Sequence, residues 1–217
     1  GVIPIEMDSW GVDVLVYTGH KGLFGPSGIG GMIVGERAII KHTRMGGTGT
    51  NSLSPFHPNE YPHRLETGTA SIPGIAGLHA AQQWFAKVGR SQSDNFDLPH
   101  YEACQVAAKH IHAKEMTSAR ILLDAFDAMT DVVIYGPSDK QPRVSTFSIN
   151  IGNLSADQVG MMLDADHGIC VRSGLHCAPT VHEDQATLRQ NGTVRFSPGF
   201  FTDDEDITQA IEGVQSI

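Results

Sequence analysis

The sequence is short of basic residues and of cysteine. Its 217 residues hold 15 lysines and arginines against 24 acidic residues, a formal net charge of −9. A chain with this balance lacks the basic surface that holds nucleic acid or an anionic membrane by bulk electrostatics. The cysteine count, three, is low and odd, which argues against a disulfide framework. We therefore expect a reducing, cytoplasmic compartment.

Long hydrophobic runs are also missing. The longest uncharged stretch, Thr67 to Ala86, is interrupted by Pro73 and His79, so it is not a membrane span. No basic segment followed by an apolar one marks a signal peptide. The hydrophobic content of 40% is nevertheless too high and too regular for a disordered chain. Length predicts one domain, or two small ones, with a real core.

Glycine is the residue present in excess. The chain has 24 glycines in 217 residues, above the usual share of roughly 7%. This excess predicts tight turns and backbone that approaches a ligand closely. The chain also opens on Gly1 and enters an apolar segment at once, which we interpret as the start of a fragment of something longer.

The N-terminal part of the chain is predicted to mix short buried strands with glycine-rich loops. The expected elements are strands over 2–7, 13–18 and 29–34, a short helix over 35–41, a loop over 45–64 and a helix over 73–88. Proline at the start of the last helix is typical of a first helical turn. The polar segment 90–97 is the candidate domain boundary.

The C-terminal part is predicted to form a compact α+β unit. A helix is expected over 99–129, straight or bent near Met116, with strands over 132–135, 144–149, 169–172 and 193–197. Ser155 with Gln158, and Thr202 with Glu205, have the capping-box spacing that opens a helix. The predicted domains are residues 1–90 and 91–217.

Lys21 is the first candidate functional residue. It follows an expected strand and lies among glycines, and ligands in open α/β sheets bind beyond the carboxyl ends of strands. A partly desolvated lysine there would have a lowered pKa and act as a nucleophilic amine. The alternatives are a surface lysine or a phosphate-binding loop, although the P-loop pattern is absent.

Two segments resemble the class V aminotransferase fold of pyridoxal phosphate (PLP) enzymes. GHKGLFGPSGIGG (19–31) is similar to the cofactor-lysine segment of its cysteine desulfurase and selenocysteine lyase branch. The resemblance implies that Lys21 is the Schiff-base residue and that Thr18 and His20 contact the cofactor phosphate. HRLETGTASIPGIAGL (63–78) is similar to a second family segment, which implies that Thr69 reaches the cofactor phosphate of a neighbouring subunit. Ala70 and Ser71 stand where the family usually has Pro-Asn.

Cys177 is the candidate nucleophile. It lies in VRSGLHCAP (171–179), where His176 and Arg172 favour a reactive thiolate. The alternative is a buried, inert cysteine, which is the interpretation for Cys104 and Cys170. The segment resembles the family signature around the persulfide-forming cysteine, with Leu175 in place of a first histidine.

Arg195, in GTVRFSPGFF (192–201), is the candidate carboxylate ligand. An arginine on a strand can hold a carboxylate by a bidentate fork, or it can pair with one of the many acidic residues. The family uses an arginine here for the substrate carboxylate, and Arg172 is expected to assist it. A zinc site was weighed because histidines and cysteines crowd into residues 167–182, but their spacing does not match the usual ligand pairs.

The resemblance implies an α/β fold: the C-terminal part of a fold-type I PLP-dependent transferase large domain, followed by a small α+β domain. It implies a PLP-dependent cysteine desulfurase-like enzyme that converts L-cysteine to L-alanine with a persulfide on Cys177. The expected partners are a second copy in a homodimer and a sulfur-acceptor protein, as in iron–sulfur cluster assembly.

Alternatives remain open for the function. One is another class V transferase or lyase, such as selenocysteine lyase. Another is an inactive fragment that binds no PLP, because the family's N-terminal half carries the ring-stacking histidine and the aspartate that pairs with the pyridine nitrogen. We expect this last description to fit the isolated 217-residue polypeptide, and the desulfurase to fit its parent.

Overall fold

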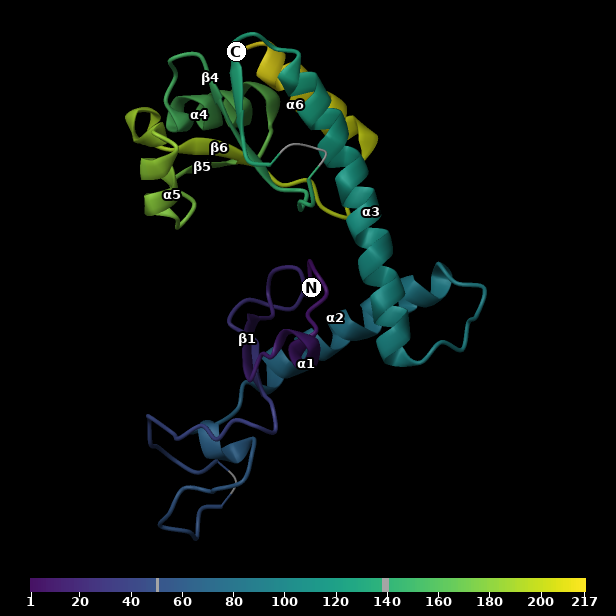
Figure 1. Ribbon diagram of the computed structural model, residues 1–217, viewed down its shortest axis with the longest axis vertical. Helices are drawn as coiled ribbons and strands as arrows, with labels where there is room; N and C mark the ends of the chain where they lie inside the picture. The colour runs from purple at the N-terminus through teal and green to yellow at the C-terminus, as the bar shows by residue number, and fades with distance from the viewer. Residues whose placement is uncertain (50, 138–140) are drawn as a thin grey trace. The chain divides into compact units, whose positions relative to one another are not determined.

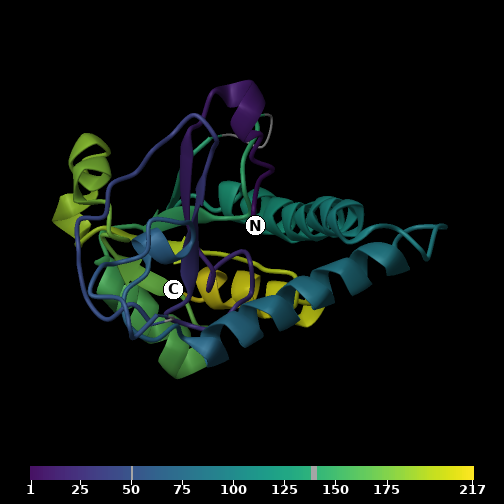
Figure 2. The ribbon, with the colours of Figure 1, turned by 90° about the horizontal axis from the view of Figure 1, so that it is seen from below.

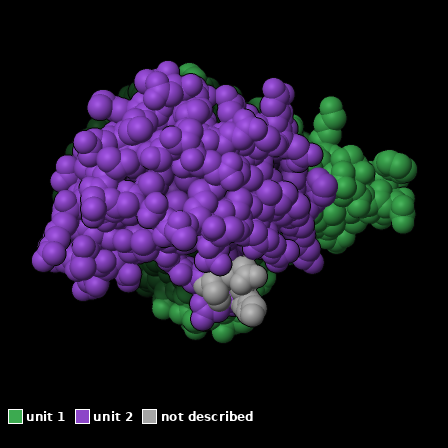
Figure 3. All heavy atoms as spheres, turned by 90° about the horizontal axis from the view of Figure 1, so that it is seen from above, with its two compact units in different colours: residues 1–108 green, residues 109–217 purple. Residues whose placement is uncertain are grey.

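The computed structural model describes residues 1–49, 51–137 and 141–217. The chain divides into two compact units, Gly1–Ala108 and Lys109–Ile217, which Figure 3 colours separately. The division falls within one long helix, α3 (His100–Asp127). Each unit is described by itself below. The boundary expected near residue 90 stays a prediction about separately folding domains.

Unit 1 is built on a two-stranded antiparallel ribbon. The strand β1 (Val14–Thr18) pairs with β2 (Gly30–Val34), and Val16 lies opposite Met32. Both strands were predicted, but the prediction that they are buried is wrong, because the Val16 side chain is 72% exposed. A short 3₁₀ turn, η1 (His63–Leu65), follows the long loop, which was predicted.

The helices of unit 1 agree only in part with the prediction. The helix α2 (Ile72–Ser91) confirms the one expected over 73–88, and Figure 2 shows it as one unbroken helix. The strand expected over 2–7 is wrong: the segment ends in a one-turn helix, α1 (Met7–Trp10), closed by Gly11 in the left-handed region. The helix expected over 35–41 is also wrong: the segment holds a single turn, in which the Ala38 N–H donates to the Gly35 carbonyl at 3.0 Å.

Unit 2 contains a four-stranded antiparallel sheet in the order β3-β4-β6-β5 (Figure 1). The strands are β3 (Val132–Tyr135), β4 (Phe147–Ile151), β5 (Arg172–Gly174) and β6 (Thr193–Phe196). Two of them, β4 and β5, begin three residues later than predicted. The α+β character of this part of the chain is confirmed.

One face of this sheet carries the core. Phe147, Ile149 and Ile151 alternate along β4, so they share a face, and all three are buried. Against this face pack α3, α4 (Ala156–His167) and α6 (Asp204–Gln215) (Figure 1). The buried contacts come from aromatic and aliphatic side chains of all four elements, for example Phe126, Val159 and Ile207.

The other face of the sheet carries a polar row. The register places Tyr135 opposite Ser148, Ser148 opposite Arg195, and Arg195 opposite Arg172. Directly opposed residues on neighbouring strands share a face. One row across all four strands therefore brings together two candidate site residues, Arg172 and Arg195. The opposite face of the same sheet packs against the core.

Helix capping was predicted correctly once and missed by one residue once. Ser155 and Gln158 form the expected capping box at α4. At α6 the box is Asp203 with Asp206 instead of Thr202 with Glu205. The physical reason is that the Thr202 hydroxyl already accepts from the Gly199 N–H at 3.0 Å. The cap therefore falls on the next side-chain oxygen.

The remaining helices are short or continuous. The segment predicted as one helix over 99–129 is the single helix α3. After β5 come α5 (Pro179–Asp184) and the 3₁₀ turn η2 (Thr187–Gln190). Among the helices of residues 1–49, 51–137 and 141–217, none combines the length and apolar character that a membrane crossing requires.

Candidate active site

The glycine-rich loop after β1 is closed by backbone hydrogen bonds. The Gly19 N–H donates to the Ile29 carbonyl at 2.8 Å, and the Gly25 N–H donates to the Gly19 carbonyl at 2.8 Å. A Cβ at Gly25 would lie 2.7 Å from that Gly19 oxygen, which is too close for any other residue. Glycine is therefore required for the loop to fold back on itself.

Lys21 lies within this closed loop and its side chain is exposed. Unit 1 therefore does not bury the Lys21 side chain, which was expected from the sequence to be partly desolvated. Beside it, the Thr18 hydroxyl and His20 Nδ1 are 2.9 Å apart. The structure thus brings three of the predicted cofactor residues, Thr18, His20 and Lys21, onto one loop at the end of one strand.

Thr69 lies elsewhere in unit 1. It borders a hollow of about 510 Å³ in front of α2, together with Thr48, Glu66 and Ser71. Lys21 does not line this hollow. Ile29 and Gly30, where the glycine-rich loop ends, line the same hollow. The role of Thr69 in a neighbouring subunit stays a prediction.

Cys177 occupies a strained turn in unit 2. The Ala178 N–H donates to the Leu175 carbonyl at 2.8 Å, and the two central residues, His176 and Cys177, have φ values of 52° and 61°. Positive φ at both central positions is the pattern of a type I′ turn, which normally uses glycine, asparagine or aspartate. A non-glycine residue held in this region is a marker of a functional site.

The sulfur of Cys177 is exposed and has a cationic neighbour. Arg172 Nη2 donates to Cys177 Sγ at 3.3 Å. His176, the residue before the cysteine, pairs its Nε2 with the Thr193 hydroxyl at 3.0 Å. Burial first, and then the positive charge of Arg195, lowers the pKa of His176 below its ordinary value. The imidazole beside the cysteine is therefore held neutral.

Arg195 faces a hollow of about 280 Å³ on the open face of the sheet. Tyr135, Ser148 and His176 also line this hollow. Arg195 Nε is buried and has no hydrogen-bond partner. Among the residues that the structure describes, no carboxylate forms an ion pair with Arg195. The guanidinium is available to an anionic ligand.

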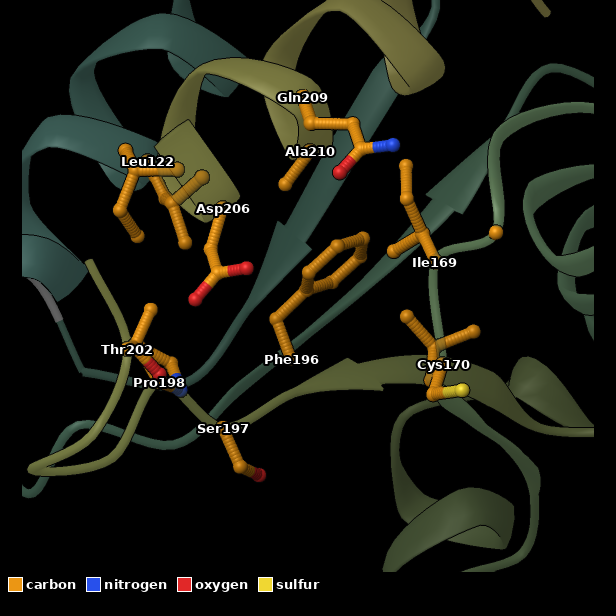
Figure 4. Close-up of a pocket in the computed structure, with 13 residues that line it drawn as sticks. Leu122, Ile169, Cys170, Phe196, Ser197, Pro198, Thr202, Asp206, Gln209 and Ala210 are labelled. Carbon is orange, nitrogen blue, oxygen red and sulfur yellow. The ribbon is translucent and has the colours of Figure 1, made fainter. Parts of the chain in front are cut away.

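The other two cysteines differ from expectation in one respect. Cys104 is half-buried, with its Sγ 3.8 Å from the Gln82 carbonyl. Cys170, expected to be buried in a strand, precedes β5 and is exposed. Figure 4 shows it at a separate hollow of about 310 Å³, lined by Phe196 and by Asp206 of α6. In the described ranges, no three histidine, cysteine or acidic side chains are grouped as metal ligands.

Comparison with known proteins decides the family. The aminotransferase class-V model matches residues 1–210 of the 217. The chain belongs to the aminotransferase class-V family. This confirms the resemblance drawn from the lysine and cysteine segments.

Relatives of this class-V chain match it over part of their own length. A cysteine desulfurase of Klebsiella pneumoniae subsp. pneumoniae is 30% identical over 99% of this chain and 48% of its own length. The apo cysteine desulfurase of Thermococcus onnurineus NA1 superimposes with a TM-score of 0.79 at 26% identity, over 100% of this chain and 50% of that one. The chain thus spans about half the length of the relatives it matches, and the fold class is confirmed.

A third match has the same fold. A C-DES mutant with glycine covalently linked to its PLP cofactor has a TM-score of 0.68 at 19% identity, over 98% of this chain and 48% of that one. At this identity the match shows the common fold alone.

Within the class-V fold, several site residues were not predicted. The Thr193 hydroxyl pairs with Nε2 of His176, the histidine beside the cysteine. The ring of the buried His182 lies next to the ring of His176, and its own Nδ1 lies 2.7 Å from the Thr187 hydroxyl. Ser148 and Tyr135 line the arginine hollow. Strand alternation could have placed Ser148 opposite Arg195, but only with the register known. Nothing in the motif around Cys177 indicates His182.

Proposed function

We propose that this chain supplies the lysine and the cysteine of a PLP-dependent cysteine desulfurase, which converts L-cysteine to L-alanine and leaves a persulfide on Cys177. The observation that carries the proposal is the exposed Cys177 sulfur in a strained turn with a guanidinium at 3.3 Å. The family match over residues 1–210 and the desulfurase relatives support it.

The lysine loop fits one side of a PLP site. Lys21 has a free path to solvent, and the Thr18 hydroxyl and His20 imidazole beside it can bind phosphate oxygens. The loop glycines have no side chains, so a planar ring can approach the backbone closely. When bound, PLP supplies the electron sink that lets bonds at the substrate Cα and Cβ break.

The side chains of this chain then divide the remaining work. Arg195 holds the substrate carboxylate with the buried face of its guanidinium. Lys21 Nζ takes the proton from the substrate Cα and later returns a proton to the carbon product. Cys177 Sγ attacks the substrate sulfur, so that an S–S bond forms while the Cβ–S bond breaks. The sulfur remains on Cys177 as a persulfide. The electron pair of the broken Cβ–S bond stays with Cβ, which takes up the proton released from the thiol groups, and the carbon skeleton leaves as alanine.

The test uses the natural protein that contains these residues, with whatever sequence flanks them. It is loaded with PLP, given L-cysteine, and assayed for alanine and for a persulfide on Cys177 by peptide mass spectrometry. Cys177→Ala is expected to abolish both products while PLP absorbance is retained. Cys170→Ala is the matched control and keeps both. Alanine formation by Cys177→Ala at the wild-type rate would contradict the proposal.

Assembly follows from the same proposal. Thr69 borders a hollow that Lys21 does not line, which supports a site completed across a homodimer. A sulfur-acceptor protein is the expected second partner, because the exposed Cys177 persulfide must be discharged before the next cycle. Sedimentation of the natural protein tests the dimer directly, and a monomer at assay concentration would contradict it.

A further inference from the structure

We infer that Arg172 is a positioning residue for the Cys177 sulfur, and not a ligand of the substrate carboxylate. The sequence left both roles open. The structure has Arg172 Nη2 donating to Cys177 Sγ at 3.3 Å. The catalytic importance of this role rests on the proposed function, whereas its test does not require that function.

Local backbone geometry brings the two side chains together. Arg172 begins the three-residue strand β5, and the turn Leu175–Ala178 follows the strand directly. Because Cys177 is in the left-handed region, its side chain leaves the turn in a direction that an ordinary turn would not allow. The sulfur therefore returns to a guanidinium only five residues earlier in the chain.

The neighbouring arginine explains why the two guanidinium groups divide their roles. Arg172 and Arg195 are directly opposed on β5 and β6, where like charges on one face are unfavourable. Arg195 lines the 280 Å³ hollow and Arg172 does not. Since Arg172 is directed to the sulfur, the carboxylate hollow is served by Arg195 and the Cys177 sulfur by Arg172.

A guanidinium at this place favours the reactive form of the nucleophile. A hydrogen bond from a cation to sulfur is stronger when the sulfur is a thiolate, and the thiolate is the species that attacks. His176 does not substitute for it, because its Nε2 is paired with Thr193 and burial keeps the ring neutral. The same donor can hold the negative terminal sulfur of the persulfide after transfer.

The experiment measures alkylation of Cys177 in this 217-residue chain, which needs neither PLP nor turnover. Rates with iodoacetamide at neutral pH are followed by peptide mass spectrometry, with Cys170 as the internal reference. Arg172→Gln is expected to slow alkylation of Cys177 by roughly three- to five-fold, and Arg172→Lys to restore part of the rate. Arg189→Gln removes a charge on exposed η2 and is the matched control, with no change expected.

Two further readouts separate an electrostatic role from a structural one. At about pH 10, where thiols are ionised with or without the arginine, the wild-type and Arg172→Gln rates should converge. The ratio of iodoacetate to iodoacetamide rates should also fall in Arg172→Gln, because a cation beside the sulfur attracts the anionic reagent. Equal rates for wild type and Arg172→Gln at neutral pH, or a deficit that persists at high pH, would overturn the inference.

The outcome is independent of the proposed function. An unchanged alkylation rate in Arg172→Gln would remove the positioning role while leaving a desulfurase in place. A desulfurase test that fails in the natural protein would leave a slowed alkylation rate unaffected.

Discussion

Replacing Cys177 by glycine is expected to stabilise unit 2 relative to replacing it by alanine. Cys177 has φ of 61° in a turn whose other central residue, His176, also has a positive φ. An L-residue pays a steric cost in this region that glycine avoids. Both substitutions remove the thiol and its contact with Arg172, so their difference isolates the backbone term.

The magnitude follows from two opposing effects. The left-handed conformation costs a non-glycine residue roughly 1–2 kcal/mol. Glycine loses more conformational entropy on folding, which opposes this by about 0.5–1 kcal/mol. The balance favours Cys177→Gly over Cys177→Ala by about 1 kcal/mol in the free energy of unfolding. The sign of this difference in stability depends on which is larger, the strain of alanine in the left-handed region or the entropy that glycine loses on folding.

Urea unfolding monitored by circular dichroism measures the difference. The control is the same pair of substitutions at Glu212, an exposed position inside α6. There alanine should exceed glycine by about 1 kcal/mol, because glycine is a poor helix former. If Cys177→Ala were as stable as Cys177→Gly, the turn would not be strained and its geometry would give no support to a functional cysteine.

Three other changes have expected outcomes. Phe126→Ala should lower the free energy of unfolding by about 3–5 kcal/mol, measured by urea titration, because the buried ring contacts Phe147 and Phe196; a loss below 1 kcal/mol would contradict the assigned core. Gly89→Ala should destabilise by roughly 1–3 kcal/mol, although alanine usually favours a helix, since its Cβ would lie 1.8 Å from the Ala103 carbonyl oxygen; a raised melting temperature would refute this packing. Burial and Arg195 lower the pKa of His176. The contribution of the neutral ring to stability is therefore complete above the ordinary imidazole pKa of about 6.5 and is lost as the pH falls below that value. The urea midpoint should fall less between pH 8 and pH 5 in His176→Gln than in wild type, and equal falls would count against the neutral ring.

Long, periodic elements were predictable from the sequence, and short ones were not. The helices α2 and α3 have enough residues for their pattern to be recognised. The strands of unit 2 were recognised from their β-branched and apolar residues, but two of the four begin three residues later than predicted. The apolar segment 2–7 has the composition of a strand but no partner strand in unit 1, and pairing is a property of the fold. The α6 cap was misplaced because Thr202 is engaged by Gly199, a contact between residues whose turn could not be foreseen.

The candidate site shows the same limit. Lys21, Cys177 and Arg195 could be named because each lies in a recognisable motif. For Arg172 the sequence offered two roles, beside Cys177 and beside Arg195, and could not decide between them, because the choice depends on which way one side chain turns from a strand end. His182 was missed for a related reason: it reaches His176 only through the packing of α5 beside the sheet, with ring centroids 5.5 Å apart. Motifs identify residue types, whereas register and turns decide what each one contacts.

The position of the cofactor bond tests the account most directly. The natural protein containing this sequence is incubated with PLP, reduced with borohydride and mapped by peptide mass spectrometry, with Lys87→Ala as the matched control for Lys21→Ala. The account predicts one PLP adduct, on Lys21, which Lys21→Ala abolishes and Lys87→Ala leaves intact, and no such adduct in the isolated 217-residue chain. An adduct in the natural protein that lies on another lysine, or that survives Lys21→Ala, would contradict it.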